Sequence, residues 1–168
     1  MKLYDSRQLG PLVFRDPLLL CSALYFLLYF DASGFLRLGL LAAFLHEWGH
    51  ILVYCALLRR FPVIEVTMTG FCMRLPSQGL ASVQRFWLAA AGPVVNLVLA
   101  GIWGLRLEQS MTIRGSAFWA ANLLTGAFNL LPIPPLDGAQ MLAALHEIRE
   151  RGKESAGNDC KKQQFRVK

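Results

Sequence analysis

The sequence predicts an all-α polytopic membrane protein with about four transmembrane helices. Of its 168 residues, 55% are hydrophobic and only 17% are charged, and the mean hydropathy is +0.41. That composition is too apolar for an ordinary soluble domain of this size. The apolar residues are gathered into four runs, and the segments between the runs carry most of the charge. A lipid bilayer is the solvent that this arrangement suits.

The positive charge is distributed unevenly along the chain. The formal net charge is +6, and cationic flanks on the cytosolic side of spanning helices account for it without a polyanionic partner. If both termini are cytosolic, about 14 of the 17 Lys and Arg residues face the cytosol, and Arg37, Arg106 and Arg114 face the other side. We therefore predict an N-in, C-in multi-pass protein with no nucleic-acid partner.

The first two apolar runs differ in length. Residues 17–30 are uncharged apart from their flanks but short, because about 20 apolar residues are needed to cross roughly 30 Å of hydrocarbon. We expect this run to span only if it tilts or draws in neighbours, and we do not expect it to be a removed signal peptide. Residues 35–58 are long enough to span, and Arg59-Arg60 closes them as a cytosolic stop signal.

The last two runs lie between residues 86 and 145. Residues 86–105 are free of charge, whereas the fourth run begins near Ala117, reaches Leu131, is interrupted by three prolines and resumes over residues 138–145. Proline removes helix hydrogen bonds, so we predict one Pro-broken last span. The predicted organisation is a cytosolic N-terminal segment over residues 1–16, a membrane-embedded core over residues 17–148, and a basic cytosolic tail, disordered, over residues 149–168.

Between the second and third runs, residues 63–75 have a strand pattern. Polar and apolar residues alternate from Val63 to Thr69, many of them β-branched, and Gly70 offers a turn. We predict a small cytosolic or membrane-associated β-ribbon here.

The middle of the second run is polar. His46 and His50 are four residues apart, so a helix places both imidazoles on one face, where they can reach one divalent metal ion with Glu47 beside it. Glu47 is about 12 residues from the end of the run, or roughly 18 Å, near the bilayer midplane. Ionisable side chains at that depth are costly, which favours a functional role over a pair of hydrogen-bonding histidines.

A catalytic zinc ion takes three protein ligands, so the two histidines require a third donor. His146 lies beyond the last run, and Glu65 lies in the alternating segment, where a solvated face explains it better. Asp137 lies inside the Pro-interrupted segment, where irregular backbone at membrane depth must be buried in protein or line a wet cavity. Asp137 can also be the N-cap of the resumed helix, a role that is compatible with ligation.

Three motifs together carry a resemblance to a known family. They are His46-Glu47-Trp48-Gly49-His50, Gly92-Pro93-Val94-Val95-Asn96 and the stretch from Asn129 through Pro132 to Asp137-Gly138. The chain resembles, over residues 35–148, the intramembrane metalloproteases of the site-2 protease family, peptidase M50. Within that family it most resembles the compact sporulation factor IVFB-like branch. It departs from larger members in having no room for a PDZ or CBS regulatory domain.

The resemblance implies a function and a set of site residues. One zinc ion per chain would be bound by His46, His50 and Asp137, Glu47 would activate water, and Asn129 would lie in the loop that meets substrate. The implied activity is hydrolysis of peptide bonds within or near transmembrane segments of membrane-anchored substrates in a bacterial cell membrane. A regulatory membrane protein or a second copy of the chain are further partners that it leaves open.

Two polar residues have plain structural explanations as well. Asn96 follows a run of small residues that favours close helix packing, and an interhelical hydrogen bond explains it better than a direct catalytic role. Asn129 can cap the broken helix or can donate to a substrate carbonyl, and the residues alone do not separate these roles.

Two other classes of function fit an apolar chain with a metal motif. One is a catalytically silent metal-binding scaffold, which would have no need of Glu47 between the histidines. The other is a transporter of transition metals, which would need polar residues along several spans. The clustering of polar residues at one depth favours the protease.

Overall fold

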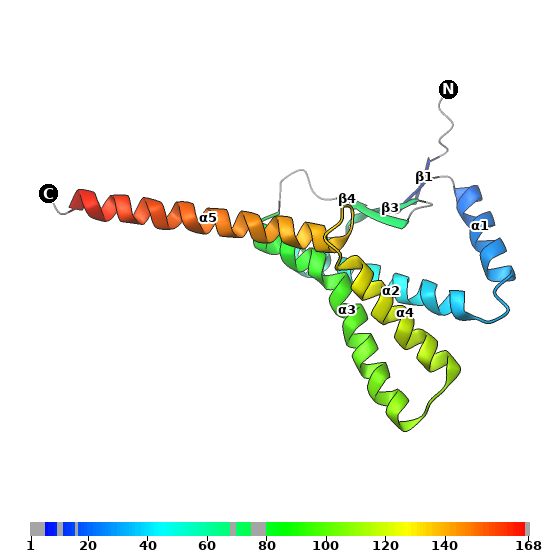
Figure 1. The fold of residues 1–168 in the computed structure, drawn as a ribbon. Coiled ribbons are helices and arrows are strands. Elements are labelled where there is room, and N and C mark those ends of the chain that lie inside the picture. Colours follow the sequence, from blue (N-terminus) through cyan, green and yellow to red (C-terminus); the bar gives the residue numbers. More distant parts are fainter. Residues whose placement is uncertain (1–5, 10–11, 16, 68–69, 75–79, 167–168) are drawn as a thin grey trace.

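The computed structural model describes residues 6–9, 12–15, 17–67, 70–74 and 80–166. Within them the chain is mostly helical (Figure 1). The helices are α1 (Pro17–Tyr29), α2 (Phe35–Leu58), α3 (Ser82–Gln109), α4 (Ile113–Asn129) and α5 (Asp137–Arg166). The strands are β1 (Ser6–Leu9), β2 (Leu12–Arg15), β3 (Val63–Thr67) and β4 (Gly70–Arg74).

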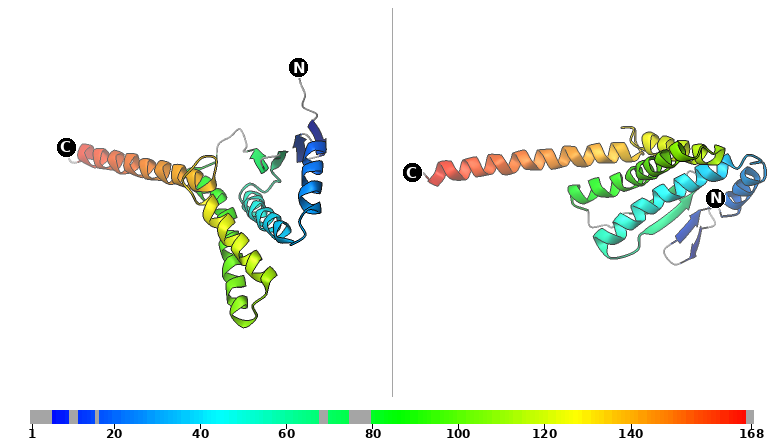
Figure 2. Two further views of the ribbon diagram at one scale, coloured as in Figure 1. Left: turned by 45° about the vertical axis from the view of Figure 1, so that its right-hand side comes forward. Right: turned by 90° about the horizontal axis from the view of Figure 1, so that it is seen from below.

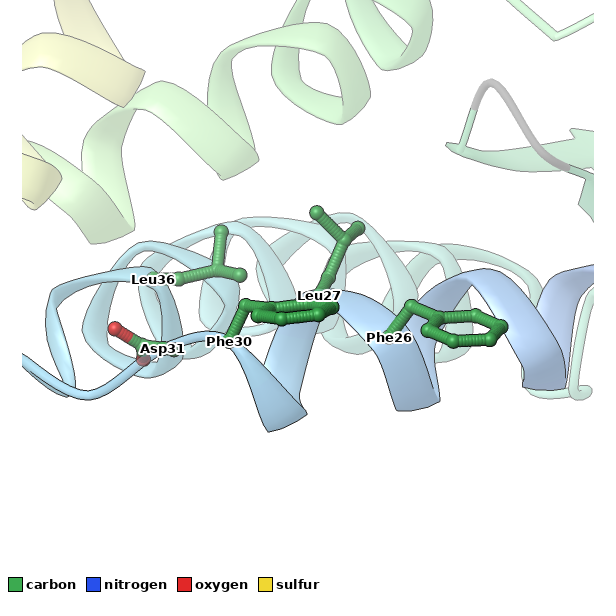
Figure 3. A pocket seen from close by; sticks show the side chains of 5 residues that line it. All are labelled: Phe26, Leu27, Phe30, Asp31 and Leu36. Carbon is green, nitrogen blue, oxygen red and sulfur yellow. The ribbon is translucent and has the colours of Figure 1, made fainter.

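The turn between α1 and α2 is held by one carboxylate. Asp31 accepts hydrogen bonds from the backbone N–H of Arg37 at 3.1 Å and from the hydroxyl of Ser33 at 3.0 Å. Gly34 precedes α2 with φ of 75°, a left-handed conformation that glycine adopts without strain. These contacts fix the start of α2. Figure 3 shows the shallow depression beside this turn, about 270 Å³ in volume, whose lining is Phe26, Leu27, Phe30, Asp31 and Leu36.

Helix α3 is the central element, because it packs against α2, α4 and α5. Helix α4 runs back along the C-terminal half of α3, where the rings of Trp103 and Phe118 meet at 4.7 Å, centroid to centroid. Helix α5 then covers the N-terminal half of α3, where Glu147 contacts Ser82. The chain therefore returns along α3 in two pieces (Figure 1).

The break between the two pieces falls where the prolines predicted it. Helix α4 ends at Asn129, and α5 begins at Asp137. The connecting residues form two tight turns, in which the N–H of Ile133 donates to Leu131 at 2.8 Å and the N–H of Leu136 donates to Ile133 at 2.9 Å. The side chains of residues 130–135 are exposed, so the described part of this chain does not cover the loop.

The structure differs from the sequence prediction at the C-terminal tail. Residues 149–166, predicted to be disordered, continue α5, and residues 167–168 lie outside the described residues. The tail has good helix formers such as Glu, Lys, Arg and Gln, and extending an existing helix avoids the cost of nucleation. The Lys153 ammonium also pairs with Glu150 at 2.8 Å, one turn earlier. Figure 2 shows that α5 projects beyond the other elements.

The four strands form one sheet with the order β1-β2-β3-β4. Strands β3 and β4 pair antiparallel, from Val63 opposite Arg74 to Thr67 opposite Gly70, in the segment predicted as a ribbon. Met68, Thr69 and Leu75 of that segment lie outside the described residues. The sheet is larger than the predicted ribbon, because the N-terminal segment forms the β1–β2 hairpin and β2 adds to β3 in parallel. In the right-hand view of Figure 2, α2 lies between α3 and the sheet.

Two of the described helices are long and apolar enough to cross a membrane, α2 and α3. Helix α1 is apolar but has 13 residues, or about 20 Å at 1.5 Å per residue. Helix α4 has 17 residues. The prediction of about four spans is therefore supported for two helices only, because the other two are shorter than the hydrocarbon thickness.

A polar contact fastens α5 to the start of α3. The Ser82 hydroxyl donates to the Glu147 carboxylate at 2.8 Å, and the Arg85 guanidinium pairs with the same oxygen. Hydrogen bonds from Ser82 and then from Arg85 hold the pKa of Glu147 below its ordinary value of 4.5. Glu147 follows the last apolar run, so this contact lies at the end of the bundle.

We expect Glu147→Gln to lower the free energy of unfolding only at pH values at which the native carboxylate is ionised. A carboxyl whose pKa is lowered by folding stabilises the native state above its ordinary pKa, and this contribution is lost as the pH falls through the lowered native value. The Tm of the native protein in detergent should thus exceed that of the variant at pH 7, and the difference should shrink below pH 4.5. Glu150→Gln is the control, because within the described part of the chain Glu150 pairs only with Lys153 of its own helix. An equal loss of Tm in both variants would contradict the role of this contact.

Candidate metal centre

Helix α2 brings two imidazoles together on its inner face. His46 and His50 are both buried, and their rings meet edge to face with centroids 4.9 Å apart. Their Nε2 atoms are 3.2 Å apart. The spacing of four residues is one helical turn, which explains why the two rings share a face.

The third predicted ligand arrives from α5. Asp137 is the first residue of that helix, and its Oδ2 atom lies 3.0 Å from Nε2 of His46 and 3.2 Å from Nε2 of His50. Asp137 is buried as well. One ligand atom from each of the three residues lies within 4.8 Å of the others. The structure therefore assembles the predicted set from positions 87 and 91 residues apart in the chain.

Hydrogen bonds on the far side of each ring determine which nitrogen faces the cluster. Nδ1 of His50 lies 2.8 Å from the carbonyl oxygen of Leu88, which can only accept, so this nitrogen carries the proton. Nδ1 of His46 lies 2.6 Å from Oδ1 of Asn96. Each neutral ring then presents the lone pair of Nε2 to the cluster. Two nitrogen lone pairs and a carboxylate oxygen converge without a donor between them, which is an arrangement that a cation satisfies.

The distances and donor types fit zinc. A tetrahedral ion with bonds of about 2.0–2.1 Å has ligand atoms about 3.3 Å apart, and the observed separations are 3.0–3.2 Å. Two imidazoles and one carboxylate are a common catalytic zinc set, with a fourth position for water. The Nδ1 contacts supply the outer hydrogen bonds that ligating histidines usually have.

Glycine at position 92 leaves the room that an ion would need. A Cβ atom built on Gly92 would lie 2.6 Å from Nε2 of His46 and closer still to Nε2 of His50. Gly138 is constrained in a similar way, because its Cβ atom would meet the Leu130 carbonyl in the loop before α5. The backbone of α3 thus closes the cluster on one side, and the loop packs directly against the first turn of α5.

Glu47 is not part of the ligand cluster. It is half-buried on α2 and interacts electrostatically with His46, His50 and Asp137. Glu47 adjoins His46 in the sequence, and its part in activating water stays a prediction.

The other polar candidates lie outside the cluster. The amide of Asn129 donates to the Thr125 carbonyl at 3.0 Å, at the end of α4, so its contact with substrate stays a prediction. His146 is exposed on α5, and Glu65 is in β3. The interhelical role expected for Asn96 is confirmed, since its amide donates to the Ala42 carbonyl of α2 at 3.2 Å. Asn96 also reaches the His46 ring, which sequence reasoning did not anticipate.

Sequence reasoning missed Asn122 of α4. Its side chain is fully buried and accepts a hydrogen bond from Asn96 at 3.0 Å. The sequence did carry a signal for Asn122, because its amide lies in the middle of an apolar run. An amide there is costly unless another polar group hydrogen-bonds to it.

Known proteins are similar to the part of the chain that holds this candidate centre. The family model described as peptidase family M50 matches residues 108–161, which include Asp137 and not the two histidines. The chain is 32% identical over 120 residues to a Synechocystis protein named as a zinc metalloprotease, sll0528. It is 30% identical over 131 residues to a Mycobacterium tuberculosis protein named as a zinc metalloprotease, Rip3.

These matches cover different shares of each protein. They include 64% and 73% of this chain but 32% and 33% of the two relatives, so the chain spans about a third of their length. Among solved structures, the site-2 protease from Methanocaldococcus jannaschii is similar with a TM-score of 0.61. The match covers 84% of this chain and 71% of that chain at 19% identity, which is a likeness of fold.

We expect Gly92→Ala to lower zinc affinity at least tenfold, because the added methyl group would clash with the Nε2 atoms of both imidazoles. Gly101→Ala is the matched control, since it lies on the same helix and its Cβ atom would meet nothing within 4 Å. Titration of the metal-free proteins with Zn²⁺ measures both affinities. Native affinity in Gly92→Ala would show that an ion does not bind between these two rings.

Proposed function

We propose a function for this chain on the basis of its family. The three comparisons support peptidase family M50, the site-2 proteases. In this proposal the chain is an intramembrane zinc metalloprotease with one zinc ion per chain. It hydrolyses peptide bonds within or near transmembrane segments of membrane-anchored proteins. The observation that carries the proposal is the convergence of His46, His50 and Asp137 beside Glu47.

The chemistry divides between the ion and the protein. A zinc ion held by the three side chains would supply a Lewis acid that makes water a better nucleophile and polarises a carbonyl. Glu47 would take the proton of the attacking water as the oxygen adds to the peptide carbonyl carbon. Glu47 would then deliver that proton to the amine nitrogen as the C–N bond breaks, which returns the carboxylate to its starting form.

The substrate would approach along the loop before α5. Residues 130–135 are exposed in this chain and lead directly to Asp137. Asn129 begins this loop, and we propose that its amide turns from the Thr125 carbonyl to donate to a substrate carbonyl. A transmembrane substrate must be locally unwound first, since a helix keeps its carbonyls in internal hydrogen bonds.

Strand pairing supports the proposed N-in, C-in topology. Strand β2 lies before α1 and pairs with β3, which lies after α2. This pairing supports the proposal that both segments lie on the same side of the membrane. The proposal therefore has α1 carry the chain across the membrane and α2, which is long enough to cross, return it to that side. The contact of Glu147 with Ser82 likewise places the part of α5 beyond the last apolar run at the start of α3. In this proposal the chain makes four passes of unequal length, and the basic side of the bundle is the cytosolic one.

The two other classes of function fit less well. The buried amides and imidazoles of α2, α3 and α4 are linked around one point, whereas a transporter needs polar side chains along a path. A silent scaffold would not need Glu47 beside the three ligands. The proposal also includes membership of the sporulation factor IVFB-like branch and a role in sporulation. It further includes location in a bacterial membrane and a regulatory partner or a second copy of the chain.

We expect Glu47→Gln to abolish cleavage and to keep zinc, because all three ligands remain while the base is lost. The assay is co-expression with single-span membrane proteins and detection of their fragments, together with the zinc content of the purified protein. Asp137→Asn is the comparison, since it keeps size and capping ability but removes the ligand charge, and it should lose both zinc and cleavage. Cleavage by Glu47→Gln at the native rate would remove Glu47 from the mechanism.

The topology predicts which sites an external protease reaches in intact cells. Tags at both termini should be protected, and a tag inserted between α3 and α4, after Ser110, should be cleaved. The inserted tag is the internal control for accessibility. Cleavage of the N-terminal tag alone would show that α1 does not cross.

A further inference from the structure

A row of hydrogen-bonded side chains links three helices to the metal centre. Asn122 of α4 contacts Asn96 of α3, and Asn96 contacts His46 of α2. Both amides are fully buried at 0% exposure, in a bundle whose other buried residues are mostly apolar. Each amide therefore needs partners inside the protein, because water does not reach it.

The donor-to-acceptor direction of these hydrogen bonds is set by a backbone carbonyl at one end of the row. The carbonyl of Phe118 can only accept, so the Asn122 amide turns its NH2 group toward it at 2.8 Å. The Oδ1 atom of Asn122 then faces Asn96 and accepts from its NH2 group at 3.0 Å. That NH2 group also donates to the Ala42 carbonyl at 3.2 Å. The remaining atom of the Asn96 amide, Oδ1, faces Nδ1 of His46 at 2.6 Å.

We propose that Asn122 is a positioning residue that acts through Asn96 to keep the proton of His46 on Nδ1. An amide can present either oxygen or NH2 to an imidazole, and the two choices select opposite tautomers of the ring. With oxygen presented, Nδ1 carries the proton and Nε2 keeps the lone pair for a ligand bond. The reversed amide would put the proton on Nε2, which faces His50 and Asp137.

The contacts separate this role from simple helix packing. Asn96 could join α2 to α3 through the Ala42 carbonyl alone. Asn122 adds a second acceptor on the NH2 side, which strengthens the preference for one orientation of the amide. The side chain of Asn122 hydrogen-bonds to Asn96 and Phe118 and, among the residues that the structure describes, not to His46, His50 or Asp137. Any effect of Asn122 on the metal must therefore pass through Asn96. The inference rests on the proposed metal site.

The first test is zinc affinity in the full-length protein in detergent, measured by titration of the metal-free form with Zn²⁺. Loss of an outer hydrogen bond typically weakens metal binding by 10–100-fold, so we expect about tenfold weaker binding for Asn122→Leu and at least as much for Asn96→Leu. Ser116→Ala is the matched control, because Ser116 is on α4 and donates to the Thr112 carbonyl four residues earlier, as Asn122 does to Phe118. It should bind zinc as the native protein does.

The double variant Asn96→Leu/Asn122→Leu decides whether the two amides act in series. If Asn122 acts only through Asn96, the double variant should bind zinc as Asn96→Leu does, within about twofold, because non-additivity marks residues in one network. The double variant also protects the test against misfolding, since two apolar groups leave no unpaired amide at the α3–α4 contact. The proposal would be overturned if the fold-losses of zinc affinity in the two single variants multiplied in the double variant. Native zinc affinity in Asn122→Leu would overturn it as well.

The second test reads the tautomer without any metal. ¹⁵N NMR of histidine-labelled, metal-free protein should show His46 protonated on Nδ1 in the native chain and in Ser116→Ala, and a mixture of tautomers in Asn122→Leu. An unchanged Nδ1–H state in Asn122→Leu would overturn the relay. A native protein that binds no Zn²⁺ would instead overturn the proposed function, so the two failures are distinguishable.

Discussion

The convergence of three acceptor atoms inside an apolar bundle is the constraint on which the rest of the structure depends. The Nε2 atoms of His46 and His50 and the Oδ2 atom of Asp137 lie 3.0–3.2 Å apart, and all three residues are buried. Without a cation or a shared proton such groups repel each other, and water cannot replace their lost hydration. The helices must therefore meet at one point and be held there.

Small residues make that meeting possible. The Cβ atom of a residue at position 49 would come within 2.9 Å of the Ala91 carbonyl, and Gly92 faces the two imidazoles. Gly126 plays a similar part between α4 and α3, where its Cβ atom would lie 3.2 Å from Asn96. Without a hydrophobic drive between helices in lipid, close backbone approach and interhelical hydrogen bonds hold a bundle together. The same contacts that pack α3 against its neighbours also shape the metal centre.

The position of Asp137 depends on two features, one at the start of α5 and one further along it. The tight loop over residues 130–136 places Asp137 at the first turn, and Gly138 lets the loop backbone approach. Ten residues further along, Glu147 joins the start of α3 through Ser82 and Arg85. Helix α5 is thus held at both ends of its contact with α3, which keeps its first carboxylate beside the histidines. This arrangement leaves residues 130–135 exposed within the described part of the chain.

The three members of the candidate metal cluster could be predicted from the sequence. His46 and His50 are a local pair, since one helical turn brings them together in any straight helix. The prolines located the break between α4 and α5, because proline cannot donate a backbone hydrogen bond. Asp137 was reached by elimination among few donors. The positions of Asn96 and of the strand-forming segment at residues 63–75 were visible too, although their partners were not.

What the sequence could not supply were contacts between distant segments. The pairing of β2 with β3 crosses two helices, and no local pattern in residues 6–15 specifies a partner some 50 residues away. The direction of the Asn122 and Asn96 amides depends on the Phe118 and Ala42 carbonyls, which belong to different helices. The sequence by itself determined which side chains can bind a metal ion, because that follows from residue type and helical spacing. Only the tertiary structure decided which of them meet and which ring nitrogen faces the centre, because those depend on hydrogen bonds across the bundle.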